Sequence, residues 1–174
     1  MSVTALRRAI RGLAVLAPLA AMILVPAPVA TASPPKVCAP VSLTAVGQDQ
    51  GADSQGNLHT TATASLAGVP VAVPVATTNA TFTPGGPPTG TTLSFSWPIV
   101  FTPISSGSPT LTANVLGTVD VGSGVFRATT TSVTGTGVLA GVSGSLTFQG
   151  TEDLGTGIFT ETITGKVCAP IKHR

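Results

Sequence analysis

Two copies of Lys-Val-Cys-Ala-Pro, at Lys36–Pro40 and Lys166–Pro170, hold the only two cysteines of this 174-residue chain, Cys38 and Cys168. The two cysteines are 130 residues apart, so a disulfide between them would close most of the chain into one covalent loop. We therefore expect a fold whose first and last elements lie side by side. Such a bond persists in an oxidising compartment, which favours a secreted protein.

The N-terminal segment, residues 1–32, has the three-part layout of a secretory signal peptide. Three arginines precede an uncharged apolar run at Gly12–Val25, and the small residues Ala30–Ala32 mark a cleavage site before Ser33. The apolar run is too short to span a bilayer comfortably, so we favour a signal peptide over a membrane anchor. The expected organisation is a signal peptide followed by a single β domain at residues 33–174, secreted and without stable membrane insertion after cleavage.

The net charge of residues 33–174 argues against a nucleic-acid partner. The whole chain has a formal charge of +2, but residues 33–174 carry five basic and six acidic residues, a net charge of −1. No clustered basic face is available, so we expect no nucleic-acid partner.

The two distant cysteines lack the local histidine pattern of a zinc site, and we expect neither a metal nor a cofactor.

Apolar and small polar residues alternate after residue 33, which predicts an all-β fold. The clearest alternation is at Leu93–Trp97, and the longest late run is Ile158–Thr164. Glycine and proline recur too often for long helices. Strand-like runs at short, regular spacing predict a single antiparallel β-barrel or, alternatively, a β-sandwich. Three Gly-x-Gly segments, at Gly122–Phe126, Gly135–Leu139 and Gly155–Phe159, predict turns whose apolar pair opens the next strand.

Two other segments are expected to lie outside the central sheet. The polar run Gln48–Asn57 predicts a loop. The apolar run Val69–Val75 contains two prolines, which lack amide donors, and this indicates an edge strand or an extended arm. One function hypothesis is therefore a cell-surface adhesion or assembly module that uses this arm.

The stretch Gly135-Thr-Gly-Val-Leu-Ala-Gly-Val-Ser-Gly-Ser-Leu-Thr-Phe-Gln-Gly150 resembles a glycine-rich segment of dirigent-like and allene oxide cyclase-like barrel proteins. It is also similar to small secreted actinobacterial β-barrel proteins. The resemblance covers about residues 117–165. It implies an antiparallel eight-stranded barrel whose apolar cavity binds a hydrophobic small molecule or guides its cyclisation or coupling. The acidic and polar cavity residues of those families have no match here, which favours binding over catalysis.

A binding barrel of this kind needs a cavity of roughly several hundred Å³ lined by large apolar side chains. The expected ligand-binding residues are Phe95, Trp97, Phe126, Phe148 and Phe159.

Glu161 is the one weak catalytic candidate. It alternates in phase with Phe159 and Ile163. If that face points inward, a carboxyl group with a raised pKa lies in the cavity. If it points outward, the intervening threonines line the interior. We expect an outward or rim position for Glu161, and a solvated position for Glu152, which lies close to a turn.

These observations favour a secreted, non-enzymatic barrel that binds a hydrophobic small molecule or has a structural role outside the cell. The alternatives are a dirigent- or cyclase-like enzyme acting on a lipophilic substrate, and the adhesion module.

Overall fold

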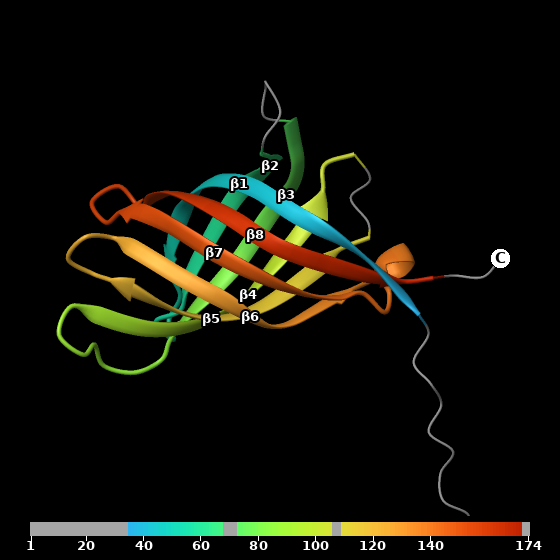
Figure 1. Cartoon of the computed structure of the whole chain (residues 1–174). Helices are drawn as coiled ribbons and strands as arrows, with labels where there is room; N and C mark the ends of the chain where they lie inside the picture. The colour runs from blue at the N-terminus through green and yellow to red at the C-terminus, as the bar shows by residue number, and fades with distance from the viewer. Residues whose placement is uncertain (1–34, 68–72, 106–108, 172–174) are drawn as a thin grey trace, which may run out of the picture. The chain divides into compact units, whose positions relative to one another are not determined.

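The computed structural model describes residues 35–67, 73–105 and 109–171 (Figure 1). Within these ranges the chain forms eight β-strands and one short 3-10 helix, η1. In chain order the elements are β1 (Lys36–Ala52), β2 (Leu58–Leu66), β3 (Val73–Pro84), β4 (Thr92–Pro103), β5 (Leu111–Asp120), β6 (Val125–Gly135), η1 (Gly137–Leu139), β7 (Ser143–Asp153) and β8 (Ile158–Pro170).

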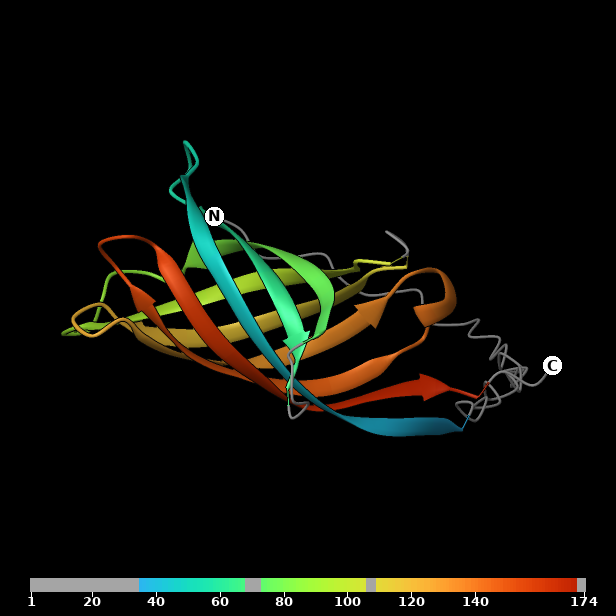
Figure 2. The ribbon, with the colours of Figure 1, turned by 90° about the horizontal axis from the view of Figure 1, so that it is seen from above.

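The strands form a closed antiparallel barrel in which each strand pairs with the next and β1 pairs with β8. This confirms the barrel and excludes the sandwich, because closure leaves no free sheet edge. The β1–β2, β3–β4, β5–β6 and β7–β8 turns all lie at one end of the barrel, which we call the open end. The starts of β1 and β7 and the end of β8 lie at the other, which we call the disulfide end. Figure 2 shows that the first residues of β1 and the last residues of β8 lie together, away from the β7–β8 turn.

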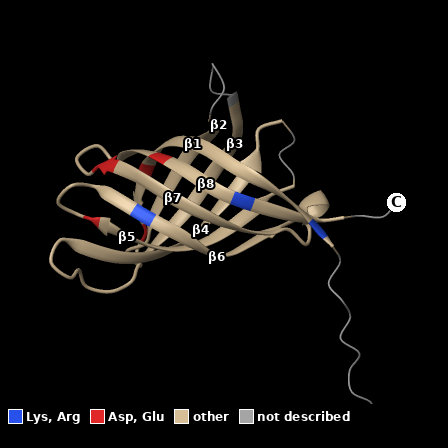
Figure 3. Ribbon diagram, in the orientation of Figure 1, with Lys and Arg blue, Asp and Glu red and all other residues tan. Residues whose placement is uncertain are grey.

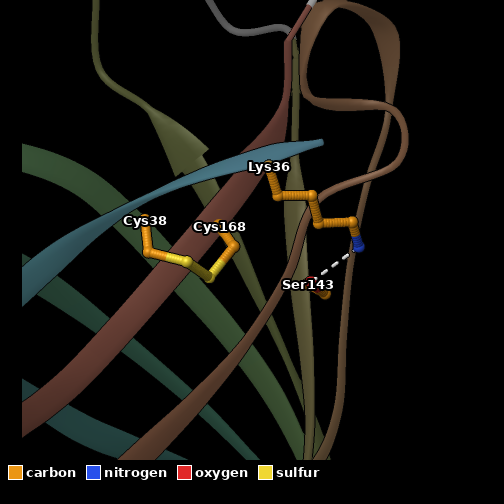
Figure 4. The surroundings of a disulfide bond; sticks show 4 residues. All are labelled: Lys36, Cys38, Ser143 and Cys168. Atoms are coloured by element: carbon orange, nitrogen blue, oxygen red, sulfur yellow. Dashed lines mark hydrogen bonds between the residues drawn. A yellow bond between two sulfur atoms is a disulfide. The ribbon is translucent and has the colours of Figure 1, made fainter. Parts of the chain in front are cut away.

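The cysteines join the strands that close the barrel. Cys38 in β1 lies directly opposite Cys168 in β8, and the two form a disulfide (Figure 4). Beside it, the Lys36 ammonium donates a hydrogen bond of 2.8 Å to the Ser143 hydroxyl in β7. The expected pairing of the segments near the two ends is therefore confirmed, and the bond covalently fixes the β1–β8 closure.

Alternation places the apolar residues inside the barrel, and three cross-strand pairs show how the interior is filled. Phe95 lies opposite Gly117, Phe126 opposite Gly150, and Phe159 opposite Gly47. In each pair the phenyl ring occupies the space where a side chain at the glycine would lie; a Cβ at Gly117 would be only 2.6 Å from the Phe95 ring. Glycine is needed at these inward positions because the facing ring covers the bare backbone.

Two local expectations are corrected. Only the second half of the predicted loop Gln48–Asn57 is a turn: β1 runs to Ala52, and a tight turn that begins at Asp53 leads into β2. The turn is short because the Asp53 carboxylate accepts hydrogen bonds from the N–H groups of Gln55 and Asn57. Gly137–Leu139 forms η1 rather than opening a strand.

The proline-rich run falls partly outside the described residues. Its last three residues, Val73–Val75, begin β3. Val73 and Pro74 lie opposite Leu66 and Ser65 of β2, beside an irregularity of the pairing between Ala64 and Ser65. A strand start next to a bulge tolerates proline, so Pro74 fits a wall strand that has no free edge.

The expected signal peptide, residues 1–32, also lies outside the described residues. Among the described residues, no helix is long and apolar enough to cross a membrane.

Candidate ligand pocket at the open end of the barrel

A pocket of about 120 Å³ opens at the turn end of the barrel. Its lining comes from the ends of strands that are distant in sequence. The lining residues are Asp49, Leu58, Thr60, Phe82, Leu93, Phe95, Trp97, Val119, Val121, Phe126, Glu152, Leu154 and Phe159. Most of this surface is apolar, and the polar groups are two carboxyls, one threonine hydroxyl and one indole N–H.

Five aromatic side chains form a connected cluster within the pocket. The centroid of the Phe95 ring lies 4.7 Å from that of Phe82 and 4.9 Å from that of Trp97, which is stacked on it at 20°. Trp97 contacts Phe126 at 6.3 Å, and Phe126 contacts Phe159 at 6.4 Å. These distances are typical of favourable aromatic pairs. The rings fill much of the interior, which is why the pocket is smaller than the several hundred Å³ expected.

Two buried side-chain atoms of the described residues have no hydrogen-bond partner, and the first is the indole Nε1 of Trp97. Its side chain is 9% exposed, and its Nε1–H has no hydrogen-bond acceptor among the described residues. Buried donors are nearly always paired, so an unpaired one calls for a water or ligand acceptor. Because Trp97 lines the pocket, this donor is a candidate contact for a pocket occupant.

Two carboxyl groups, Asp49 from β1 and Glu152 from β7, lie in the wall of the pocket. Desolvation, together with hydrogen bonding to Asp49 and repulsion from it, raises the pKa of Glu152 to about 7. Glu152 is half-buried in this wall, so the expectation of a solvated Glu152 holds only in part. Glu152 follows Phe148 and Gly150 at two-residue spacing on the inward face of β7, so it turns inward even though the β7–β8 turn is close by.

Glu161 points into the barrel, and the expectation of an outward or rim position was wrong. The residue is 6% exposed, whereas Thr160 and Thr162 on either side of it are exposed. Its cross-strand neighbours are Ala45 in β1 and Gly150 in β7, and these small residues leave room for the carboxyl group. One of its oxygens, Oε2, has no partner among the described residues, and burial raises the pKa of Glu161 to about 7.

Four of the five expected ligand-binding aromatics, Phe95, Trp97, Phe126 and Phe159, line the pocket. Phe148 is fully buried but lies outside the pocket lining. Glu161, although internal, is also outside that lining.

Phe82, Asp49 and Glu152 are among the lining residues that sequence reasoning missed. The available signal was strand parity, since each lies two residues from another inward position: Ala80, Gly47 and Gly150.

The described residues contain no group of three or more His, Cys, Asp or Glu side chains placed to hold a metal ion. The arm proposed for adhesion or assembly, residues 69–75, is described only from residue 73 onward, so that hypothesis stays a prediction.

Known proteins resemble this chain in structure and not in sequence. No protein family and no curated protein matches the sequence. Among solved structures, the pterocarpan synthase dirigent protein GePTS1 matches with a TM-score of 0.50 and 10% identity, covering 80% of this chain and 94% of that one. The pterocarpan synthase dirigent protein PsPTS1 matches with a TM-score of 0.51 and 12% identity, covering 78% and 97%. The chain therefore has the eight-stranded antiparallel barrel fold of the dirigent proteins, as the glycine-rich segment predicts.

Proposed function

We propose that this protein acts outside the cell, after removal of residues 1–32, as a barrel that binds a small, mostly apolar molecule in its open-end pocket. The observation that carries the proposal is the pocket itself, a partly open cavity lined by five aromatic side chains. Ligand sites are typically concave, mostly apolar and supplied with a few polar groups. The disulfide fits an oxidising compartment.

The size of the pocket limits the buried part of the ligand to about one ring. An apolar cavity of about 150 Å³ accommodates benzene, and this pocket measures about 120 Å³. Val121 and Leu154, at the rim, are 43% and 50% exposed and extend the apolar surface outward. A larger ligand would place one ring inside and rest its remainder on this rim.

Trp97 supplies a specific assay for this proposal. It is the only tryptophan, and the chain has no tyrosine, so the tryptophan emission of the protein reports on the pocket alone. We expect benzyl alcohol, a single-ring probe with one hydroxyl, to change this emission in a saturable way. The matched control is Val119→Phe, which places a ring in the pocket wall and should abolish the saturable change while the barrel still melts cooperatively.

Equal responses from the wild type and the folded Val119→Phe variant would place the probe elsewhere and overturn the proposal. So would the absence of saturation with any single-ring compound. Native mass spectrometry of the protein from its own secretion medium then identifies the natural ligand.

A second function, acid–base catalysis on a lipophilic substrate, is favoured by one observation. Glu152 lies in the pocket wall with its pKa raised to about 7, and a general acid or base works best when its pKa is near the working pH. On this reading, Glu152→Gln keeps the affinity for a neutral ligand but slows its conversion at least about a hundredfold. Unchanged conversion in that variant would leave binding as the function.

A further inference from the structure

The charges that line the pocket all have the same sign. Asp49 and Glu152 are its ionisable residues, and no lysine, arginine or histidine is among the lining residues. Among the described residues, the one contact between a basic side chain and a carboxylate joins His59 Nε2 to Asp53 on the β1–β2 hairpin, at 3.3 Å, so neither pocket carboxyl has a basic partner. Two adjacent carboxyls without a cation repel each other when both are ionised.

The charged residues elsewhere on the barrel add to the negative charge at the open end. Figure 3 shows the acidic residues gathered toward the open end, whereas Lys36 and Lys166 lie toward the disulfide end. Arg127, near the start of β6, is the described lysine or arginine nearest the open end, and its side chain is exposed on the outer face. A mouth ringed by charges of one sign attracts counter-ions and repels ligands of the same sign.

The turn acids differ from the pocket acids in how their charge is stabilised. Asp120 accepts hydrogen bonds from the Thr91 hydroxyl and from the backbone N–H groups of Ser123 and Gly122. Asp153 accepts a hydrogen bond from the backbone N–H of Gly155. These bonds hold the pKa of Asp120 and of Asp153 below the usual value. The turn acids therefore stay ionised and contribute to the field, while the pocket carboxyls stay available to a ligand.

The remaining lining groups suit a compact organic cation. The faces of aromatic rings attract ammonium groups, and the effect grows when the cation is removed from water. The unpaired Trp97 N–H offers a separate contact to an acceptor on the ligand or to a water molecule. An ammonium at the two carboxyls and a ring among the aromatic side chains would use both parts of the pocket.

We infer that the open-end pocket selects organic cations that carry one ammonium group and one ring. It prefers them to neutral molecules of the same shape and to carboxylic acids. This inference rests on the proposed binding function. The sign and position of Asp49 and Glu152 set the preference.

Three nearly isosteric probes test the inference: benzylamine, benzyl alcohol and benzoate at pH 8, where benzylamine is still protonated. The single indole N–H signal of Trp97 in ¹H–¹⁵N spectra follows binding. We expect benzylamine to bind about tenfold more tightly than benzyl alcohol, and benzoate to produce no saturable shift.

Variants locate the source of this preference. The double variant Asp49→Asn/Glu152→Gln should bind benzylamine and benzyl alcohol with equal affinity, and its retained binding of benzyl alcohol shows that the pocket is intact. Asp153→Asn removes the same type of charge from the neighbouring exposed residue and should change the preference less than about threefold.

The outcomes separate the inference from the proposed function. Benzyl alcohol or benzoate binding at least as tightly as benzylamine would overturn charge selection while leaving the binding function standing. Failure of all three probes would overturn the binding function itself. A preference that survives in the double variant would assign the selection to groups other than Asp49 and Glu152.

Discussion

Replacing Glu161 with glutamine should stabilise the barrel at pH 8 and remove most of the pH dependence of its stability. The carboxyl is buried without a partner for Oε2, and burial raises its pKa from 4.5 to about 7. The folded state therefore holds the proton more tightly than the unfolded state. This stabilisation is fully present below pH 4.5 and is lost as the pH rises through about 7.

The size of this change in the free energy of unfolding follows from the same shift in the pKa of Glu161. Each tenfold change in the acid dissociation constant corresponds to about 1.4 kcal/mol, so Glu161 lowers the free energy of unfolding by about 3 kcal/mol between pH 4.5 and 8. Glu152 acts in the same direction but contributes less, because it is only half-buried and solvent screens its charge. An uncharged glutamine at position 161 avoids the loss.

Urea denaturation at pH 5 and pH 8 measures the effect. The wild type should be less stable at pH 8, and Glu161→Gln should be the more stable protein at that pH. Asp153→Asn, an exposed control on the β7–β8 turn, should keep the pH dependence of the wild type. Equal wild-type stability at the two pH values, with no gain from Glu161→Gln, would show that the ionised carboxyl has a partner or reaches water, and would refute the reasoning.

Three further predictions concern closure, packing and the pocket. Serine at both Cys38 and Cys168 should lower the free energy of unfolding by up to about 5 kcal/mol, and an unchanged urea midpoint would contradict this. Gly117→Ala should lower the free energy of unfolding by about 1–3 kcal/mol, because the new Cβ meets the facing strand. Gly155→Ala, in a turn with more room, should lower it less. Equal losses for the two variants in urea denaturation would refute this explanation of the packing. Benzylamine affinity, followed by calorimetry, should rise from pH 5.5 to 8.5 as Glu152 loses its proton, and a flat profile would contradict its place in the pocket.

Strand parity made much of the fold predictable from sequence. Alternation at Leu93–Trp97 correctly indicated that Phe95 and Trp97 share the inward face, and the duplicated cysteine segments indicated the closure between β1 and β8. Parity gives the face of a strand but not the depth along the barrel. For that reason Phe148 has the inward parity of the pocket residues yet lies outside the lining.

The acidic residues were harder to place because long-range pairing decides their surroundings. Glu161 is accommodated by Ala45 and Gly150, which become its neighbours only through the register of β8 with β1 and β7. Asp49 lies in a run whose polarity indicated a loop, but the β1–β2 hairpin extends past it and carries it into the pocket wall. Neither arrangement is encoded in local composition.

Isotope-filtered nuclear Overhauser measurements on the labelled protein saturated with benzyl alcohol locate a single-ring ligand within the barrel. If the ring binds among the aromatic residues at the open end, its protons give contacts to the Trp97 indole and to the Val119 methyl groups, and none to Val37 at the disulfide end. Saturable binding that gives contacts only outside the pocket, with none to Trp97, would contradict binding at the open end.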